Sequence, residues 1–154
     1  MEREEDFPIK EIDPTASFPY LAEIPQKPKQ LYMRGSLENV KHKKVIAFVG
    51  SRAYTSYGAN ACRTLIEGLR GYNIVIVSGL AMGIDAIAHK AALDAGLTTL
   101  AFPGSGLGWK YIHPAINRGL AKEILASGGA LVSEYPEETR GAIWTFPNRN
   151  RIVA

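Results

Sequence analysis

The chain has 154 residues, 46% of them hydrophobic and 21% charged, with a formal net charge of +3. This length allows one domain with a substantial core, and the composition is that of an ordinary globular protein. No apolar run approaches the ~20 residues that a membrane span needs, and the acidic N-terminus is unlike a signal peptide. A single cysteine, Cys62, excludes a disulfide framework and a thiolate metal cluster. We therefore expect a cytoplasmic protein with no membrane segment and no metal centre.

Charge is distributed unevenly in the first third of the chain. Residues 1–13 are acidic, whereas a basic stretch precedes the first long apolar run (Lys27, Lys29, Arg34, Lys41, Lys43 and Lys44). A basic edge attracts polyanions such as nucleic acid. Because a charged run is more often a merely solvated surface, this stretch alone does not predict a function.

The N-terminal segment differs in character from the rest. Residues 1–30 contain repeated prolines and no sustained hydrophobic period, which predicts an extended arm with about one helical turn. A short strand-like segment at 31–35, closed by a glycine, begins the domain proper. We expect two parts: the arm at 1–30 and a single domain at 31–154.

Apolar runs and helical patterns alternate from residue 45 onward. The runs predict strands at 45–49, 73–77, 98–102 and 130–133, the first of them buried on both faces. Between them, helices are predicted from a cap at Thr55 or Ser56 to a stop at Gly71, at about 84–95, and at about 114–127. This alternation with short connections predicts a three-layer α/β fold with a parallel sheet. Because the chain ends soon after a further helix begins near residue 146, we expect the sheet to be truncated at its C-terminal side.

Short segments rich in glycine and hydroxyl groups follow three of the predicted strands, at 50–52, 78–79 and 104–106. The carboxyl ends of parallel strands share one edge of a sheet, so these segments should share a rim. Glycines let an anion approach the backbone, hydroxyls donate hydrogen bonds to it, and Arg52 can hold a phosphate with two parallel bonds. Turns of this composition also occur for conformational reasons alone. Three of them together with an arginine favour a phosphate pocket.

Two common phosphate motifs are missing. No Gly-x-x-x-x-Gly-Lys-Ser/Thr sequence occurs, and the glycines at 104, 106 and 108 lack the Gly-x-Gly-x-x-Gly spacing. We therefore expect no nucleotide cofactor.

Evidence for catalysis is weak. Asp85 and His89 share a helix face, which would suit two metal ligands or an acid–base pair, but no third partner is evident apart from His113. The helix dipole explains Asp85, and partial burial explains His89. Asp85 would also suit a pairing with Arg52. Glu134, at the end of the fourth strand, is an isolated carboxylate.

The last segment favours nucleic acid. Arg149, Asn150 and Arg151 are predicted at the start of a helix, where the dipole disfavours cations unless an anion or a carboxylate answers them. Trp144 and Phe146, just upstream, suit stacking on bases, with core packing as the alternative.

Four motifs follow one another along the chain: Val49-Gly50-Ser51-Arg52 with Thr55 and Tyr57-Gly58; Ser78-Gly79-Leu80-Ala81-x-Gly83-Ile84-Asp85 with Ala88-His89; Ser133-Glu134-Tyr135-Pro136; and Phe146-Pro147-x-Arg149-Asn150-Arg151-Ile152. In this order and with these intervals they resemble the DNA-processing protein A family (DprA, also called Smf), over about residues 18–154. Upstream, Leu31-Tyr32-x-x-Gly35 fits the same pattern.

The resemblance implies an extended Rossmann-like domain that binds single-stranded DNA without catalysis. It implies that such proteins protect incoming DNA during natural transformation and recombination and help to load the RecA recombinase. Carried over by position, the nucleic-acid-binding residues are Gly50, Ser51, Arg52, Ser78, Gly79, Phe146, Arg149 and Asn150. Arg151 is assigned a structural role.

The sequence departs from the family pattern at three places. The loop at 108–114 lacks the Asp and Tyr-Pro usual there. The family continues past the last motif through strands that carry its dimer surface, so we expect that surface and much of the RecA contact to be missing. The small helical domain that often precedes the region is absent or reduced to residues 1–17.

Two other functions compete with DNA binding. The first is a small-nucleotide-binding sensor or a nucleoside-monophosphate phosphoribohydrolase on a related scaffold. Such enzymes usually show Pro-Gly-Gly-x-Gly-Thr-x-x-Glu, and Pro103-Gly104-Ser105-Gly106 lacks the threonine and the placed glutamate. The second is a purely protein-interaction fragment.

Overall fold

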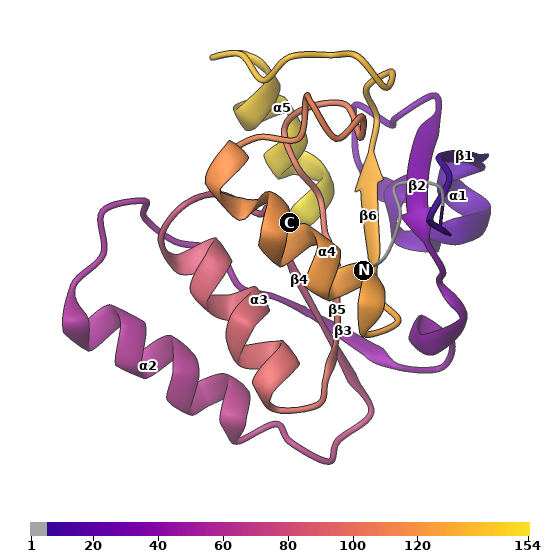
Figure 1. Cartoon of the computed structure of the whole chain (residues 1–154). Coiled ribbons are helices and arrows are strands. Elements are labelled where there is room, and N and C mark those ends of the chain that lie inside the picture. Colours follow the sequence, from indigo (N-terminus) through magenta and orange to yellow (C-terminus); the bar gives the residue numbers. More distant parts are fainter. Residues whose placement is uncertain (1–5) are drawn as a thin grey trace.

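The computed structural model describes residues 6–154, so the first five residues of the predicted arm lie outside the described part (Figure 1). The strands are β1 (Lys10–Ile12), β2 (Leu31–Gly35), β3 (Lys44–Ala47), β4 (Ile74–Ser78), β5 (Thr98–Ala101) and β6 (Ala130–Ser133). The α-helices are α1 (Pro14–Ser17), α2 (Ser56–Glu67), α3 (Ile84–Asp94), α4 (Arg118–Ala126) and α5 (Thr145–Val153). Short 3-10 helices are η2 (Pro19–Glu23), η3 (Glu38–Val40) and η4 (Ala115–Asn117).

All six strands form one sheet in the order β1-β2-β6-β5-β4-β3. The pairs β3–β4, β4–β5 and β5–β6 are parallel, whereas β2 pairs antiparallel with β6 and with β1. The predicted Rossmann-like α/β fold is confirmed, with two antiparallel strands added at one side. No helix within residues 6–154 is long and apolar enough to cross a membrane.

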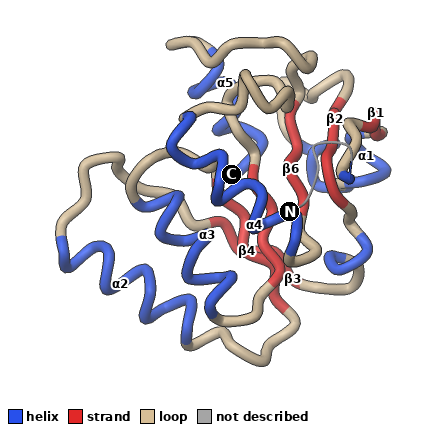
Figure 2. The backbone as a smooth tube through the Cα atoms, in the orientation of Figure 1, coloured by secondary structure: helices blue, strands red, loops and turns tan. Residues whose placement is uncertain are grey.

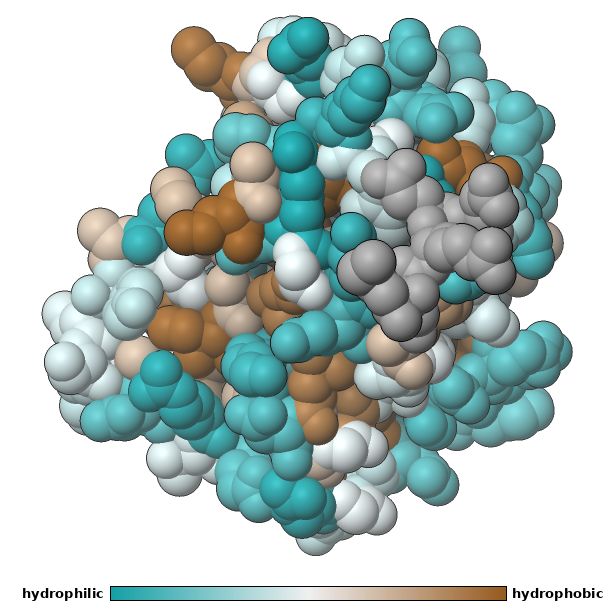
Figure 3. Space-filling model, in the orientation of Figure 1, coloured by the Kyte–Doolittle hydropathy of each residue, from teal (hydrophilic) through white to brown (hydrophobic). Residues whose placement is uncertain are grey.

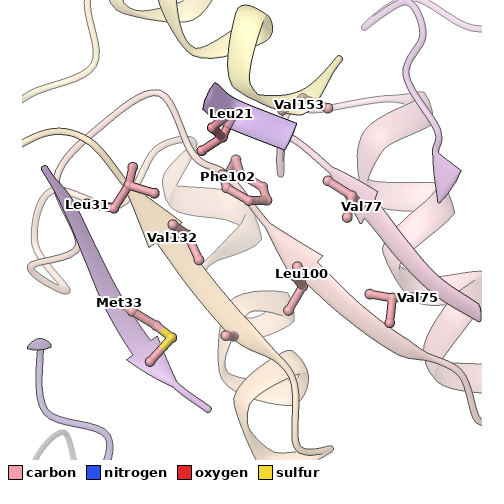
Figure 4. Close-up of a cluster of buried hydrophobic side chains, with 10 residues drawn as sticks. Leu21, Leu31, Met33, Val75, Val77, Leu100, Phe102, Val132 and Val153 are labelled. Carbon is pink, nitrogen blue, oxygen red and sulfur yellow. The ribbon is translucent and has the colours of Figure 1, made fainter. Parts of the chain in front are cut away.

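Helices and irregular segments cover the two faces of the sheet. On one face, α2 and α3 pack over β3 and β4, and α4 packs over β5 and β6 (Figure 1). On the other face, η2 and the end of α5 cover the strands, with Leu21 and Val153 beside Phe102 (Figure 4). The protein therefore has three layers, and the N-terminal segment forms part of the third.

The strand β3 is not buried on both faces, so that prediction was wrong. It lies at the edge of the sheet, with Val45 and Val49 exposed to 55% and 64%. Ile46 and Phe48 point the other way and pack against the α2–α3 layer. The outer face stays uncovered because the cover formed by η2 and α5 extends only as far as β4.

Helix boundaries also differ from the predicted ones. The cap at Thr55 is confirmed, since its Oγ1 accepts a hydrogen bond from the Gly58 amide at 3.0 Å. However, α2 ends at Glu67 because Gly68, with its low helix propensity, takes the C-cap position. The helix α4 begins at Arg118, because Asn117 is buried and donates its side-chain amide to the Leu80 carbonyl at 2.8 Å.

Candidate nucleic-acid interface

A cavity of about 290 Å³ opens where β3 ends and α5 packs against the sheet. Because β3, β4 and β5 are parallel neighbours, the segments that follow them share one rim, as predicted. A long loop leads from β6 to α5 at this end of the sheet (Figure 2). Five of the eight predicted binding residues line the cavity, namely Gly50, Arg52, Phe146, Arg149 and Asn150.

Arg52 supplies the accessible positive charge of this cavity. Its side chain is exposed, and its Cζ lies 5.1 Å from the centroid of the Phe146 ring. No carboxylate within residues 6–154 forms an ion pair with it. A guanidinium that is positioned by an aromatic ring and forms no ion pair with a carboxylate can bind an anion with two parallel hydrogen bonds.

Two glycines allow close packing of the backbone around Arg52. Gly83 has φ 85° and ψ −131°, and a Cβ there would lie 2.3 Å from the Ser51 carbonyl oxygen and 2.7 Å from the Arg52 Cα. A Cβ on Gly50 would lie 2.7 Å from the Ile84 side chain. Gly83 therefore sets the position of Arg52, a role that the sequence alone did not predict beyond its place in a motif. Its position directly before α3 was the available signal.

Phe146 is half-buried at the first turn of α5. Its ring fills the space beside Gly104, where a Cβ would lie 2.5 Å from the ring, and it contacts the ring of His113 at a centroid distance of 5.2 Å. One portion of the ring therefore packs in the protein, and another lines the cavity, where stacking on a base stays a prediction. Trp144 is 61% exposed and meets Tyr135 edge-on.

Arg149 is buried, and its contacts are mostly internal. Its Nη1 donates to the carbonyls of Gly79 and Phe102, both at 2.6 Å, and its Nε donates to Asn150 Oδ1 at 2.9 Å. Burial lowers the pKa of Arg149, and the Asp85 carboxylate opposes that shift. Arg149 thus ties α5 to the ends of β4 and β5. Its contact with a ligand stays a prediction.

The Asp85 carboxylate interacts electrostatically with Arg149, and no ion pair joins it to Arg52, the partner that the sequence also allowed, within residues 6–154. Asp85 Oδ2 accepts the Gly79 amide at 3.0 Å. Burial raises the pKa of Asp85, whereas the charge of Arg149 and hydrogen bonds from backbone amides act in the opposite direction. This carboxylate therefore has a structural role, through its hydrogen bond to Gly79 and its charge interaction with Arg149.

Ser78 and Gly79 lie behind the cavity wall. Ser78 is fully buried, and its Oγ donates to the Phe48 carbonyl at 2.5 Å, which joins β4 to the end of β3. The amide and carbonyl of Gly79 are bonded to Asp85 and Arg149. The structure therefore places both residues as supports of the rim, whereas Ser51 is exposed on it.

The prediction that α5 begins with misplaced cations was wrong. The helix begins at Thr145, so Arg149 is in its middle and Arg151 in its last turn, where the dipole favours a cation. Arg151 forms a two-point ion pair with Glu134 at 2.6 and 2.7 Å and donates to the Gln26 carbonyl at 2.8 Å. The pair neutralises Glu134 and fixes α5 against the N-terminal segment.

The remaining candidates do not form a reactive centre. His89 is fully buried, and its Nδ1 lies 2.8 Å from Thr99 Oγ1. Burial, assisted by the charge of Arg149, lowers the pKa of His89 to about 3. No three potential metal-ligating side chains gather anywhere in residues 6–154.

Three residues of the basic stretch, Arg34, Lys43 and Lys44, do not reach the rim. Arg34 is buried and donates to the carbonyls of Leu107 and Phe7 at 2.8 and 2.6 Å. Lys44 is the first residue of β3 and Lys43 precedes it, so both lie at the opposite end of that strand from Arg52. These lysines therefore do not extend the cavity's positive charge.

A larger groove of about 450 Å³ lies among α2, α3 and α4, on the mostly hydrophilic face that Figure 3 shows. Its charged side chains neutralise one another, since Lys90 pairs with Asp94 at 3.8 Å and with Glu123 at 3.5 Å. It offers no net positive surface to an anion.

The comparison with known proteins agrees with this geometry. The model of the family described as DNA recombination-mediator protein A matches residues 3–154. The chain belongs to this family. The resemblance drawn from the four motifs is thereby confirmed.

The relatives of this chain in the DNA recombination-mediator protein A family include longer proteins. Protein Smf of Escherichia coli (strain K12) is 41% identical over 136 residues, which are 88% of this chain and 36% of that protein. DNA processing protein DprA of Streptococcus pneumoniae (strain ATCC BAA-255 / R6) is 42% identical over 134 residues, 87% of this chain and 46% of that protein. The chain thus spans less than half the length of these two relatives.

Two solved structures of family members share the fold. The X-ray structure of DprA from Streptococcus pneumoniae matches with a TM-score of 0.80 and 38% identity, covering 97% of this chain and 51% of that one. DNA processing protein A from Helicobacter pylori matches with a TM-score of 0.79 and 30% identity, covering 96% of this chain and 65% of that one. The Helicobacter pylori protein is described as having a unique single-stranded DNA binding mode.

Proposed function

We propose that this chain binds single-stranded DNA at the cavity lined by Arg52, Phe146 and Asn150, and that it catalyses no reaction on the DNA. The observation that carries the proposal is the exposed Arg52 guanidinium, held over the Phe146 ring without a carboxylate partner in the described chain. A backbone phosphate would bind to this guanidinium, as phosphates do to arginine in most protein–DNA contacts.

Asn150 completes the binding surface. Its Oδ1 accepts a hydrogen bond from Arg149 Nε, which turns the amide nitrogen of this exposed side chain outward as a donor. Phe146 offers part of its ring to a base, and stacking of this kind tolerates any sequence. The proposed mode therefore combines one phosphate contact, one stacking surface and one amide donor, without base-specific readout.

The wider role follows from the family and is part of the same proposal. The longer family proteins that hold single-stranded DNA in this way would work in the cytoplasm, protecting incoming DNA and helping to load RecA on it. This chain spans less than half the length of these two relatives. We therefore propose DNA protection, RecA loading and the family's dimer for the longer family proteins, and only the DNA contact for this chain.

No observation favours the small-nucleotide enzyme. The loop at 103–106 that would cradle its phosphate is filled by the protein itself. Gly104 packs against Phe146, and a Cβ on Gly106 would lie 2.1 Å from the Pro136 carbonyl oxygen.

The test is the affinity for fluorescein-labelled oligothymidine, measured by anisotropy at several salt concentrations. We expect micromolar or tighter binding that weakens steeply with salt. Arg52→Ala should lower the affinity by about tenfold or more, because it removes a charge-assisted contact. Lys44→Ala, which deletes an equal charge at the opposite end of β3, should leave the affinity unchanged. Equal affinities for the Arg52→Ala variant and the parent chain, with both folded by circular dichroism, would overturn the proposal.

A further inference from the structure

Two tyrosines near Arg52 have exposed side chains that the proposed cavity does not use. Tyr54 is 51% exposed and Tyr57 is 84% exposed. Tyr54 lies in the segment between β3 and α2, and Tyr57 in the first turn of α2. Figure 1 shows that this segment swings outward from the strand ends before α2 begins. The tyrosines therefore belong to the exposed segment that leads away from the rim at Arg52.

We propose that Tyr54 and Tyr57 form a second base-stacking platform, which binds the unpaired bases next to the phosphate held by Arg52. The inference rests on the proposed function and extends it by naming where the strand leaves the cavity. Tyr54 is two residues from Arg52, so their Cα atoms lie within about 7 Å of each other. A strand anchored at Arg52 thus has the Tyr54 ring within reach of its neighbouring nucleotides.

The charge of the segment suits a polyanion. Residues 50–66 contain two arginines, Arg52 and Arg63, and no aspartate or glutamate. The first turn of α2 carries no acidic side chain, so its positive dipole end is not neutralised locally. The segment itself therefore presents no carboxylate to a DNA strand that follows it. The exposed aromatic rings favour single-stranded DNA over a duplex, because only unpaired bases present their faces for stacking.

The segment is also held firmly, which limits the entropy lost on binding. Ser51 Oγ accepts the Ala53 amide at 3.1 Å, and the Ser51 carbonyl accepts the Ile84 amide at 3.2 Å. Thr55 caps α2 through the Gly58 amide. The backbone that carries both rings is thus fixed at each end of the loop. Its conformation does not have to become ordered when DNA binds.

The experiment compares a short and a long oligothymidine, of about 5 and about 15 nucleotides, which bracket common footprints of single-strand binding surfaces. The variants are Tyr54→Ala/Tyr57→Ala and Tyr54→Phe/Tyr57→Phe. Loss of one stacked base should weaken binding about 5- to 150-fold, equivalent to about 1–3 kcal/mol. We expect that loss for the long oligonucleotide with the alanine variant and near-parent affinity with the phenylalanine variant, which keeps both rings.

Salt dependence separates this platform from the phosphate site. The alanine variant should keep the parent slope of log K against log salt, whereas Arg52→Ala should reduce that slope by about 0.7. Tyr72→Ala, which removes a ring exposed to 66% beyond the other end of α2, should leave the affinity unchanged. If Arg52→Ala weakens binding and the tyrosine variants match the parent chain, the platform is refuted and the phosphate site stands. If the parent chain binds no oligothymidine, both proposals fail.

Discussion

The side chains of Asp85 and Arg149 converge on Gly79, so close that a Cβ on Gly79 would be 2.8 Å from Asp85 Oδ2 and 2.6 Å from Arg149 Cζ. Asp85 binds the Gly79 amide, and Arg149 binds the Gly79 carbonyl. One peptide segment at the end of β4 is thus fixed by a carboxylate and a guanidinium that come from different helices. The rim behind Arg52 depends on this arrangement.

Replacing Asp85 by Asn should destabilise the protein. The change removes the carboxylate charge that offsets the burial of Arg149, and it replaces the charged acceptor of the buried Gly79 amide, which costs about 1.5–3 kcal/mol. Urea denaturation followed by circular dichroism measures the loss. Asp94→Asn is the matched control, because Asp94 is exposed and meets Lys90 only at 3.8 Å, so its loss should cost less than about 1 kcal/mol. Equal costs for the two variants would contradict the role assigned to Asp85.

The same Asp85→Asn variant should bind oligothymidine more tightly than the parent chain while it remains folded. Asp85 lines the cavity, so its neutralisation raises the local positive potential that Arg52 and Arg149 create. The measurement is anisotropy at low salt without denaturant, with the Asp94→Asn variant as reference. A lower affinity in the folded variant would show that Asp85 contributes to binding through geometry rather than charge.

Gly83→Ala should impair both folding and DNA binding. The backbone of Gly83 is in a region that only glycine adopts readily, and an added Cβ would meet the Ser51 carbonyl at 2.3 Å. We expect a loss of stability of about 1–3 kcal/mol and a weaker affinity for oligothymidine, because the Arg52 backbone must move. Thermal unfolding and anisotropy measure the two effects.

Gly119→Ala is the control for that variant. Gly119 lies in α4 with no atom within 4 Å of an added Cβ, so the change should stabilise the helix by about 0.5–1 kcal/mol without affecting DNA affinity. A Gly83→Ala variant with parent stability and parent affinity would refute the close packing of Gly83 under Arg52.

The sequence predicted those features of the site that depend on local patterns. Apolar runs predicted β4, β5 and β6, and parallel pairing then required a shared rim for the segments after the strands. The glycines and Arg52 were identifiable because they stand directly after strands. The cap at Thr55 was predictable for the same reason, since the hydrogen bond involved spans three residues.

Roles that depend on distant contacts were not predictable in this way. Arg149 is 70 residues from the Gly79 carbonyl to which it donates, and nothing near Arg149 in the sequence indicates that partner. Ser78 resembles an exposed hydroxyl of a turn, but its burial depends on where the backbone of Phe48 lies. The pattern of β3 likewise matches a central strand, because an apolar run does not reveal whether a second layer covers it.

Stability should fall as the pH falls from about 6.5 toward about 3, in part because of His89. In the folded protein its pKa is lowered to about 3, whereas the unfolded chain takes up the proton near the ordinary value of 6.5. Within that window the unfolded state binds more protons, so His89 contributes a loss of up to about 1.4 kcal/mol per pH unit of acidification. Asp85, with a raised pKa, acts with the opposite sign just above 3.8.

The contribution of His89 is measured by comparing the pH dependence of unfolding for the parent chain and His89→Asn. An asparagine can still donate to Thr99 Oγ1 but does not titrate, so the slope between pH 6.5 and 4 should be shallower in the variant. His42→Asn is the control, because His42 is exposed and has a positive φ of 63° that asparagine tolerates. Parallel pH profiles for His89→Asn and the parent chain would exclude His89 as the titrating group.

Replacing Val45 by Lys should reduce association between copies of this chain. At the edge of the described sheet, β3 pairs only with β4; Val45 in this strand is exposed, as is Val49 two residues beyond its end. An uncovered apolar edge strand promotes pairing with another chain, and an edge lysine prevents it. Sedimentation velocity over a range of concentrations should therefore show self-association in the parent chain and less in Val45→Lys, with unchanged stability because Val45 is already exposed. Leu65→Lys, which changes a residue exposed to 62% on α2, should behave like the parent chain. A parent chain that stays monomeric, or an equal effect of the two lysines, would contradict the role of the β3 edge.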